Sequence, residues 1–109
     1  MHDMGIYHRD VKMMNIFVRQ DSRRDIRFLL GDFGSSCLLK QDQMMNDRLG
    51  TMHWMAPEVI NRQQNGLKAD VWSMGVLLHE LISGEHPYDG DSFTELRANY
   101  KEQEITFKE

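Results

Sequence analysis

The sequence is poor in the features that mark secreted, membrane-spanning and zinc-binding proteins. Its 109 residues include one cysteine, Cys37, so no internal disulfide can form, and no signal-peptide pattern is present. We therefore expect an intracellular protein, cytoplasmic by default, with the nucleus left open. The apolar runs are short clusters such as 76–78, far below the roughly 20 residues that span a bilayer. The five histidines show no metal-site spacing with Cys37, which argues against a zinc site.

Charge and composition narrow the range of partners. The net charge of −4 gives no reason to expect nucleic acid or an anionic membrane as a partner. Hydrophobic residues make up 40% and charged residues 28% of the chain, which is ordinary for a globular protein and argues against wholesale disorder. No internal repeat or low-complexity tract is present. A length of 109 residues allows one domain at most, and the oligomeric state is left open.

Local patterns predict a hairpin and a long loop in the first half of the chain. Two runs of β-branched and aromatic residues, 16–19 and 26–30, flank a polar connection and indicate two paired strands. From 34 to 54 neither the helical nor the strand period is sustained, so we expect a long loop, which is usually functional or disordered. At the start, Gly5 is expected to end the last turn of a helix.

Two helices are expected in the second half. Residues 68–83 are apolar around most of the helix circumference and are followed by Gly84, so this helix should be buried. A shorter amphipathic helix is expected after Ser92, which fits an N-cap with Glu95 reaching back to it in a capping box.

The residues that could carry chemistry begin near the start. Residues 6–16 read I-Y-H-R-D-V-K-M-M-N-I, so that Asp10, Lys12 and Asn15 stand in a short polar segment between apolar flanks. Loops of this kind, held by a packed scaffold, commonly carry catalytic side chains. Further motifs follow in order: D-F-G at 32–34, A-P-E at 56–58, and D-V-W-S-x-G at 70–75.

Together these motifs resemble those of the eukaryotic protein kinases, whose catalytic loop reads H-R-D-L-x-x-x-N. The resemblance covers almost the whole chain and implies an α+β, kinase-like fold. It predicts a mainly α-helical, partial C-terminal lobe with a short β-hairpin near the catalytic loop. A kinase catalytic domain is longer than 109 residues, so 1–109 is expected to be a partial domain without the small lobe and the last large-lobe helices.

The resemblance also implies a role for each polar residue of the motifs. Asp10 would orient the substrate hydroxyl and accept its proton, and Lys12 would lie against the γ-phosphate of ATP. Asn15 and Asp32 would hold Mg²⁺, which prefers oxygen ligands. A lysine two residues after Asp10, with Thr51 ahead of A-P-E, is typical of serine/threonine kinases, where this threonine bonds the catalytic aspartate and lysine. The expected function is ATP-dependent phosphorylation of protein serine and threonine hydroxyls.

Other motif residues are expected to be structural. His8 and Phe33 would pack in a hydrophobic stack, anchored on the long helix by Asp70. Glu58 would pair with an arginine that this sequence does not contain, and Gly34 completes D-F-G. Taken singly, such residues have plainer interpretations: Asp32 could form an Asx turn with Gly34, Asp70 could be a first-turn helix acid, and Asp10 and Asn15 could be turn residues.

Arg9 raises the question of regulation. In kinases with an arginine before the catalytic aspartate, activation usually needs a loop phosphate that neutralises this arginine. The hydroxyl residues between 34 and 54 are Ser35, Ser36 and Thr51, while Asp47 occupies the position that is often phosphorylated. We hypothesise that Asp47 pairs with Arg9 as a built-in, partial substitute for phosphate. The alternative is that Asp47 simply sits in solvent.

The phosphate-covering glycine loop and the lysine–glutamate pair of the small lobe are absent from the sequence. Loss of one preorganised electrostatic donor typically costs about 3–4 kcal/mol in the transition state, so we expect the chain alone to be inactive. The competing interpretation is a non-catalytic, kinase-like interaction or regulatory fragment. Such a fragment would bind a partner through the surface around Trp54, Tyr88 and the helix after Ser92.

Overall fold

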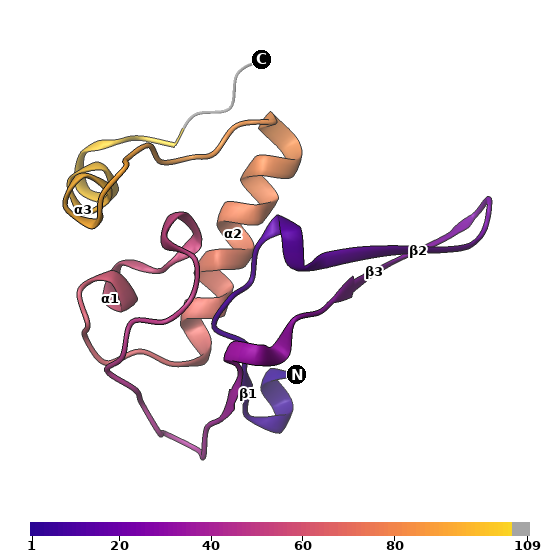
Figure 1. The fold of residues 1–109 in the computed structure, drawn as a ribbon, viewed down its shortest axis with the longest axis horizontal. Helices are drawn as coiled ribbons and strands as arrows, with labels where there is room; N and C mark the ends of the chain where they lie inside the picture. Colours follow the sequence, from indigo (N-terminus) through magenta and orange to yellow (C-terminus); the bar gives the residue numbers. More distant parts are fainter. Residues whose placement is uncertain (106–109) are drawn as a thin grey trace.

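The computed structural model describes residues 1–105, and its framework is the long helix α2 (Leu67–Ser83) (Figure 1). The short helix α1 (Pro57–Ile60) and the helix α3 (Phe93–Glu102) lie on one side of α2, and a β-hairpin projects from the other. The molecule is flat, with extents of 45 × 41 × 19 Å. No helix within 1–105 is long and apolar enough to cross a membrane.

The first strand pair was not expected from the sequence. A 3₁₀ turn at His2–Met4 ends at Gly5, which has φ 72° and confirms the predicted helix end. The strand β1 (Ile6–Tyr7) then pairs antiparallel with β4 (Cys37–Leu38). The predicted long loop over 34–54 is interrupted by β4, by the end of the 3₁₀ turn Phe33–Ser35 and by the 3₁₀ turn Met52–Trp54. A two-residue strand has too few side chains to show a period.

The predicted hairpin is confirmed, with longer strands than expected. β2 (Ile16–Ser22) pairs antiparallel with β3 (Asp25–Leu30), and the register sets Phe17 opposite Leu29. The polar residues assigned to the connection continue the ladder, with a register shift between Gln20 and Ser22. Because a ladder is formed by backbone groups, exposed polar residues can extend it as well as apolar ones.

The helix α2 confirms the expected bounds to within one residue, and it ends at Gly84 with φ 73°. The expectation that it is buried all round is wrong. Val76 and Leu77 are 4% exposed, whereas the side chains of Leu78 and Leu81 are more than half exposed. A slab 19 Å thick is about two helix diameters, so the elements present can cover α2 on one side only.

The core lies between α2, α1, α3 and β1. Its buried members are Tyr7, Leu39, Met55, Ala56, Val59, Ile60, Ala69, Tyr88 and Leu96. Ser92 caps α3 as predicted, since its Oγ accepts from the Glu95 N–H at 3.2 Å. Glu95 reaches one residue further than expected, because its Oε2 accepts from the Asp91 N–H at 2.8 Å instead of from that of Ser92.

Candidate active site

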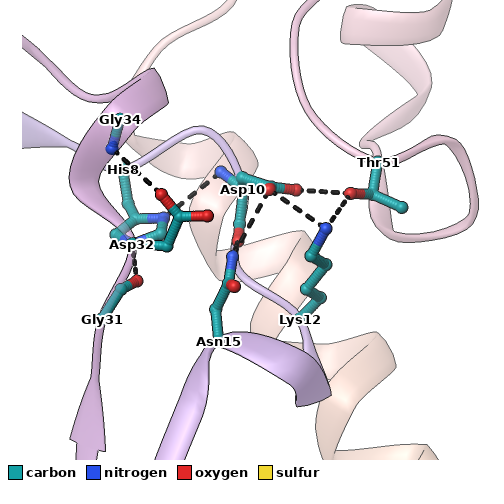
Figure 2. Close-up of polar contacts among 8 residues, drawn as sticks. All are labelled: His8, Asp10, Lys12, Asn15, Gly31, Asp32, Gly34 and Thr51. Carbon is teal, nitrogen blue, oxygen red and sulfur yellow. Dashed lines mark hydrogen bonds and ion pairs between the residues drawn. The ribbon is translucent and has the colours of Figure 1, made fainter.

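The centre of the candidate site is the carboxylate of Asp10, which several side chains hold in one orientation (Figure 2). The Thr51 hydroxyl donates to Asp10 Oδ1 at 2.6 Å, and Lys12 Nζ lies 3.2 Å from Asp10 Oδ2. Lys12 Nζ also donates to Thr51 Oγ1 at 2.6 Å. Asn15 Nδ2 donates to the Asp10 carbonyl at 2.8 Å and to Oδ2 at 3.3 Å. Residues 41 positions apart are thus joined around one carboxylate.

This surrounding keeps Asp10 ionised. Burial raises the pKa of its carboxyl group, but hydrogen bonds from Thr51, Lys12 and Asn15, with the charge of Lys12, outweigh burial, so the pKa lies below its ordinary value of 3.8. An ionised carboxylate accepts a hydrogen bond from a hydroxyl group at neutral pH, so the geometry suits orienting such a group.

Asp32 is brought to the site by contacts of its neighbours. The Gly31 N–H donates to the Asn15 carbonyl at 2.9 Å, and His8 Nε2 donates to the Gly31 carbonyl at 2.9 Å. Since a carbonyl only accepts, this fixes the proton on Nε2 and leaves His8 Nδ1 to accept from the Asp10 N–H at 3.3 Å. Asp32 itself has φ 53°, and its Oδ1 accepts from the Gly34 N–H at 3.3 Å (Figure 2).

Asp70 fixes the backbone of this segment from the first turn of α2. Its carboxylate is 3% exposed and accepts from the N–H groups of His8 and Arg9, each at 2.9 Å. Arg9 has φ 74°, a left-handed conformation that costs a non-glycine residue about 1–3 kcal/mol and needs such support. The ring of His8 contacts that of Phe33 edge-on, with centroids 4.9 Å apart. The structure thus contains the expected contact between His8 and Phe33 and the anchor at Asp70, while Phe33 stays half exposed.

The family model for the protein kinase domain matches residues 1–109 of this chain. The chain belongs to the protein kinase family. It is similar to the serine/threonine-protein kinase pakA of Talaromyces marneffei, with 41% identity over 101 residues, covering 92% of this chain and 15% of that protein. It is also similar to the serine/threonine-protein kinases STE20 of Eremothecium gossypii and Saccharomyces cerevisiae, at 39% and 40% identity over 101 residues; these matches cover 92% of this chain and 10% of each relative. The chain thus spans between a tenth and a seventh of the length of these kinases.

The loop ahead of A-P-E is joined to Arg9 by the ion pair that the sequence suggested. The guanidinium of Arg9 is paired with the carboxylate of Asp47, and their side chains are 8% and 50% exposed. Gly50, with φ 123°, lies so close to the Arg9 carbonyl that a Cβ would collide with it. Asp47 is therefore paired with Arg9 in the structure, and the alternative of an unpaired Asp47 in solvent is wrong. Of the loop serines, Ser35 ends the turn after Asp32, and the Ser36 hydroxyl is buried with no partner within 1–105.

Tyr88 is placed differently from what the sequence suggested, and Glu58 has no cationic partner among the described residues. Tyr88 is 7% exposed, stacked on Trp72 at 5.9 Å and packed against Tyr100 at 4.6 Å, so its assignment to a binding surface is wrong. Its ring completes an aromatic cluster that the sequence does not reveal. Glu58 lies in the first turn of α1 and lines a pocket of about 860 Å³, and it makes no ion pair within 1–105.

Sequence reasoning missed Asn65, which is 2% exposed and bonded to three segments. The only local signal was N-G at 65–66, which indicates a turn. That signal places the backbone and says nothing of the side chain's partners.

Proposed function

We propose that this chain is the catalytic segment of an ATP-dependent protein serine/threonine kinase, which transfers the γ-phosphate of ATP to serine or threonine hydroxyls of protein substrates. The observation that carries the proposal is the Asp10 carboxylate, held at once by Thr51, Lys12 and Asn15. Phosphoryl transfer depends on positioning and charge neutralisation, and an oriented carboxylate beside an ammonium group serves both.

The donor set fits the cofactors that this reaction uses. Asn15 directs its N–H₂ group at Asp10, so that its amide oxygen is turned to the other side, and Asp32 brings a carboxylate. These are the hard oxygen ligands that Mg²⁺ prefers, so the two residues would hold the ion that neutralises the phosphates of ATP. Lys12, already beside Asp10, would approach the transferred phosphate. Asp10 would accept a hydrogen bond from the substrate hydroxyl and take up its proton as the new phosphate ester forms.

Regulation is proposed to involve the Arg9–Asp47 pair. A carboxylate brings one negative charge, against about 1.5–2 for a phosphate group, and has fewer acceptor oxygens. Asp47 would therefore hold the loop in the active arrangement partially and without phosphorylation. In the chimera described next, Asp47→Ala should lower kcat, and unchanged activity would remove Asp47 from this role.

The test is a chimera in which this chain replaces the matching segment of the 41%-identical pakA kinase, because that kinase supplies the remaining parts of the domain. The chimera should phosphorylate serine and threonine in a generic protein substrate. Asp10→Asn should lower kcat by about 10²–10⁴-fold, the range for a general base, whereas Asp21→Asn on the hairpin should not change it. A folded chimera whose activity is indifferent to Asp10→Asn would refute the proposal.

A non-catalytic, kinase-like interaction fragment remains the second candidate, favoured by the exposed apolar side chains of α2 such as Leu78, Leu81 and Ile82. Mg-ATP separates the two candidates in the chimera. A ligand at 100 times its dissociation constant adds about 2.7 kcal/mol of stability, which a thermal melt detects. A folded chimera with no shift at millimolar Mg-ATP would favour the interaction fragment.

A further inference from the structure

Asn65, in the turn before α2, joins three segments through one side chain. Its Oδ1 accepts from the Tyr7 hydroxyl of β1 at 3.1 Å. Its Nδ2 donates to the carbonyl of Asp47 at 3.2 Å and to that of Gln63 at 3.1 Å. The residue is 2% exposed, so these bonds are not exchanged for water.

The orientation of this amide is determined by its partners. Nδ2 faces two carbonyl oxygens, which can only accept, so the N–H₂ group must lie on that side. Burial raises the pKa of Tyr7, so its hydroxyl is neutral and can donate to Oδ1. Of the residues able to occupy this space, asparagine supplies an acceptor for the tyrosine and two donors for the carbonyls.

The backbone of Asn65 holds the same loop at a second point. The Met45 N–H donates to the Asn65 carbonyl, and the Asn65 N–H donates to the Met45 carbonyl, each at 2.8 Å. Loop residues 45–47 are thus attached to the turn before α2 by the backbone at Met45 and by a side chain at Asp47.

This attachment matters because the Arg9–Asp47 pair is weak as a restraint by itself. The Asp47 side chain is 50% exposed, and an ion pair open to water contributes little against the entropy of ordering its loop. With its carbonyl already held by Asn65, Asp47 loses less freedom when it pairs with Arg9. The amide therefore preorganises the ion pair.

The same attachment determines where Thr51 lies. From Asp47 the loop runs four residues to Thr51, passing Gly50 in close contact with the Arg9 carbonyl. Thr51 then donates to Asp10 and accepts from Lys12. Both ends of the segment 47–51 are fixed, one by Asn65 and the other by the catalytic carboxylate.

We propose that Asn65 is a positioning residue, which holds the loop backbone at Asp47 so that Arg9 is paired and Thr51 reaches Asp10. This deepens the proposed kinase function and rests on it for its catalytic consequence, whereas the structural consequence can be measured without it. Asn65 touches none of the reacting groups and acts through Asp47.

The structural test is hydrogen–deuterium exchange on the 109-residue chain. In Asn65→Ala, the amides of 46–51 should exchange about tenfold faster than in the wild type, while those of α3 stay unchanged. The matched control is Asn99→Ala, which also removes an amide bond to a carbonyl, that of Asp89 at 2.7 Å, but far from the loop. Equal loop exchange in the two variants, or equal acceleration throughout the chain, would overturn the proposal.

Two further variants keep the test decisive if alanine prevents folding. Asn65→Asp preserves the shape of the side chain, but its carboxylate cannot donate a hydrogen bond when ionised. The ratio of loop exchange in this variant to that in the wild type, measured at the same pH, should therefore be larger at about pH 8 than at about pH 5. Tyr7→Phe removes the bond to Oδ1 and spares the bond to Asp47, so it should leave the loop unchanged. A pH-independent Asn65→Asp effect, or a Tyr7→Phe effect as large as that of Asn65→Ala, would contradict the role of the Asp47 bond.

The catalytic test uses the pakA chimera. Asn65→Ala should lower kcat about tenfold and leave KM for Mg-ATP within about twofold, because the loop aligns the reacting carboxylate and not the nucleotide. Faster loop exchange with unchanged kcat would overturn the positioning role. A wild-type chimera without kinase activity would instead refute the proposed function and leave the exchange result standing.

Discussion

Replacing Asp70 should destabilise the chain far more than replacing an exposed aspartate that is also hydrogen-bonded. Asp70 is 3% exposed, and its carboxylate accepts from the N–H groups of His8 and Arg9 at 2.9 Å each. A hydrogen bond to a charged group contributes about 1.5–3 kcal/mol, so Asp70→Ala should cost about 3–6 kcal/mol. The cost includes loss of support for the left-handed backbone of Arg9.

The matched control is Asp21, whose carboxylate accepts two bonds from Arg19, both at 2.8 Å, on the exposed hairpin. Its side chain is 38% exposed, and an ion pair of this kind contributes about 0–1 kcal/mol. The Asp70 carboxylate also contacts the ring of His2, whose Nε2 lies 2.9 Å from Oδ2, so Asp70 has three partners and Asp21 has two. The two aspartates differ most in burial.

Urea unfolding, followed by the fluorescence of the two tryptophans, measures the difference. With a slope of about 1–3 kcal/mol per molar urea, a loss of 3 kcal/mol lowers the midpoint by about 1–3 M. Asp70→Asn keeps one acceptor oxygen and turns an N–H₂ group toward the other donor, so its midpoint should fall between those of Asp70→Ala and the wild type. If Asp70→Asn and Asp21→Asn had the same midpoint, burial would not determine the strength of these bonds.

Three other results are expected. Thr51→Val should raise the pKa of Asp10, because it removes a hydrogen bond that lowers this pKa. The ¹³C chemical shift of the Asp10 carboxyl group, followed against pH, measures the change. An unaltered titration of Asp10 would contradict the Thr51 bond. Burial lowers the pKa of His86 in the folded state below its ordinary value of 6.5, so folding favours the neutral ring. The contribution of the neutral His86 ring to stability is therefore full above pH 6.5 and is lost as the pH falls toward the pKa of the folded state. The melting temperature should fall with pH in that window, and less so in His86→Phe. Ser92→Ala should cost about 1 kcal/mol by removing the cap of α3, with Ser22→Ala on the hairpin as a neutral control in the same melt.

Local sequence patterns were sufficient for the elements whose cause is local. The bounds of α2 follow from its helical run and from Gly84, and the start of α3 from Ser92, because caps act within one turn. The residues of the candidate site were found through motifs, and the structure brings Asp10, Lys12, Asn15 and Thr51 together. A motif specifies side chains at particular spacings, so it can name residues that only the fold brings together.

Contacts between distant segments could not be predicted in this way. The pairing of β1 with β4 joins Tyr7 to Cys37 across 30 positions, and neither strand is long enough to show a period. The burial of Tyr88 depends on Trp72 and Tyr100, and the exposure of Leu78 depends on which face of α2 the other elements cover. Burial is a property of what packs against a residue, which a local pattern does not contain.

The sequence by itself determined the family, the candidate residues around Asp10 and the two longer helices, since each is encoded within a short segment. Only the tertiary structure decided how the loop that contains Asp47 is held next to the Asp10 carboxylate. Asn65 lies in a turn whose dipeptide predicts nothing but a turn, and its role arises because folding places Tyr7, Gln63 and Asp47 around one buried amide. A buried amide must satisfy its donors and acceptors with whatever surrounds it, and those surroundings exist only in the folded chain.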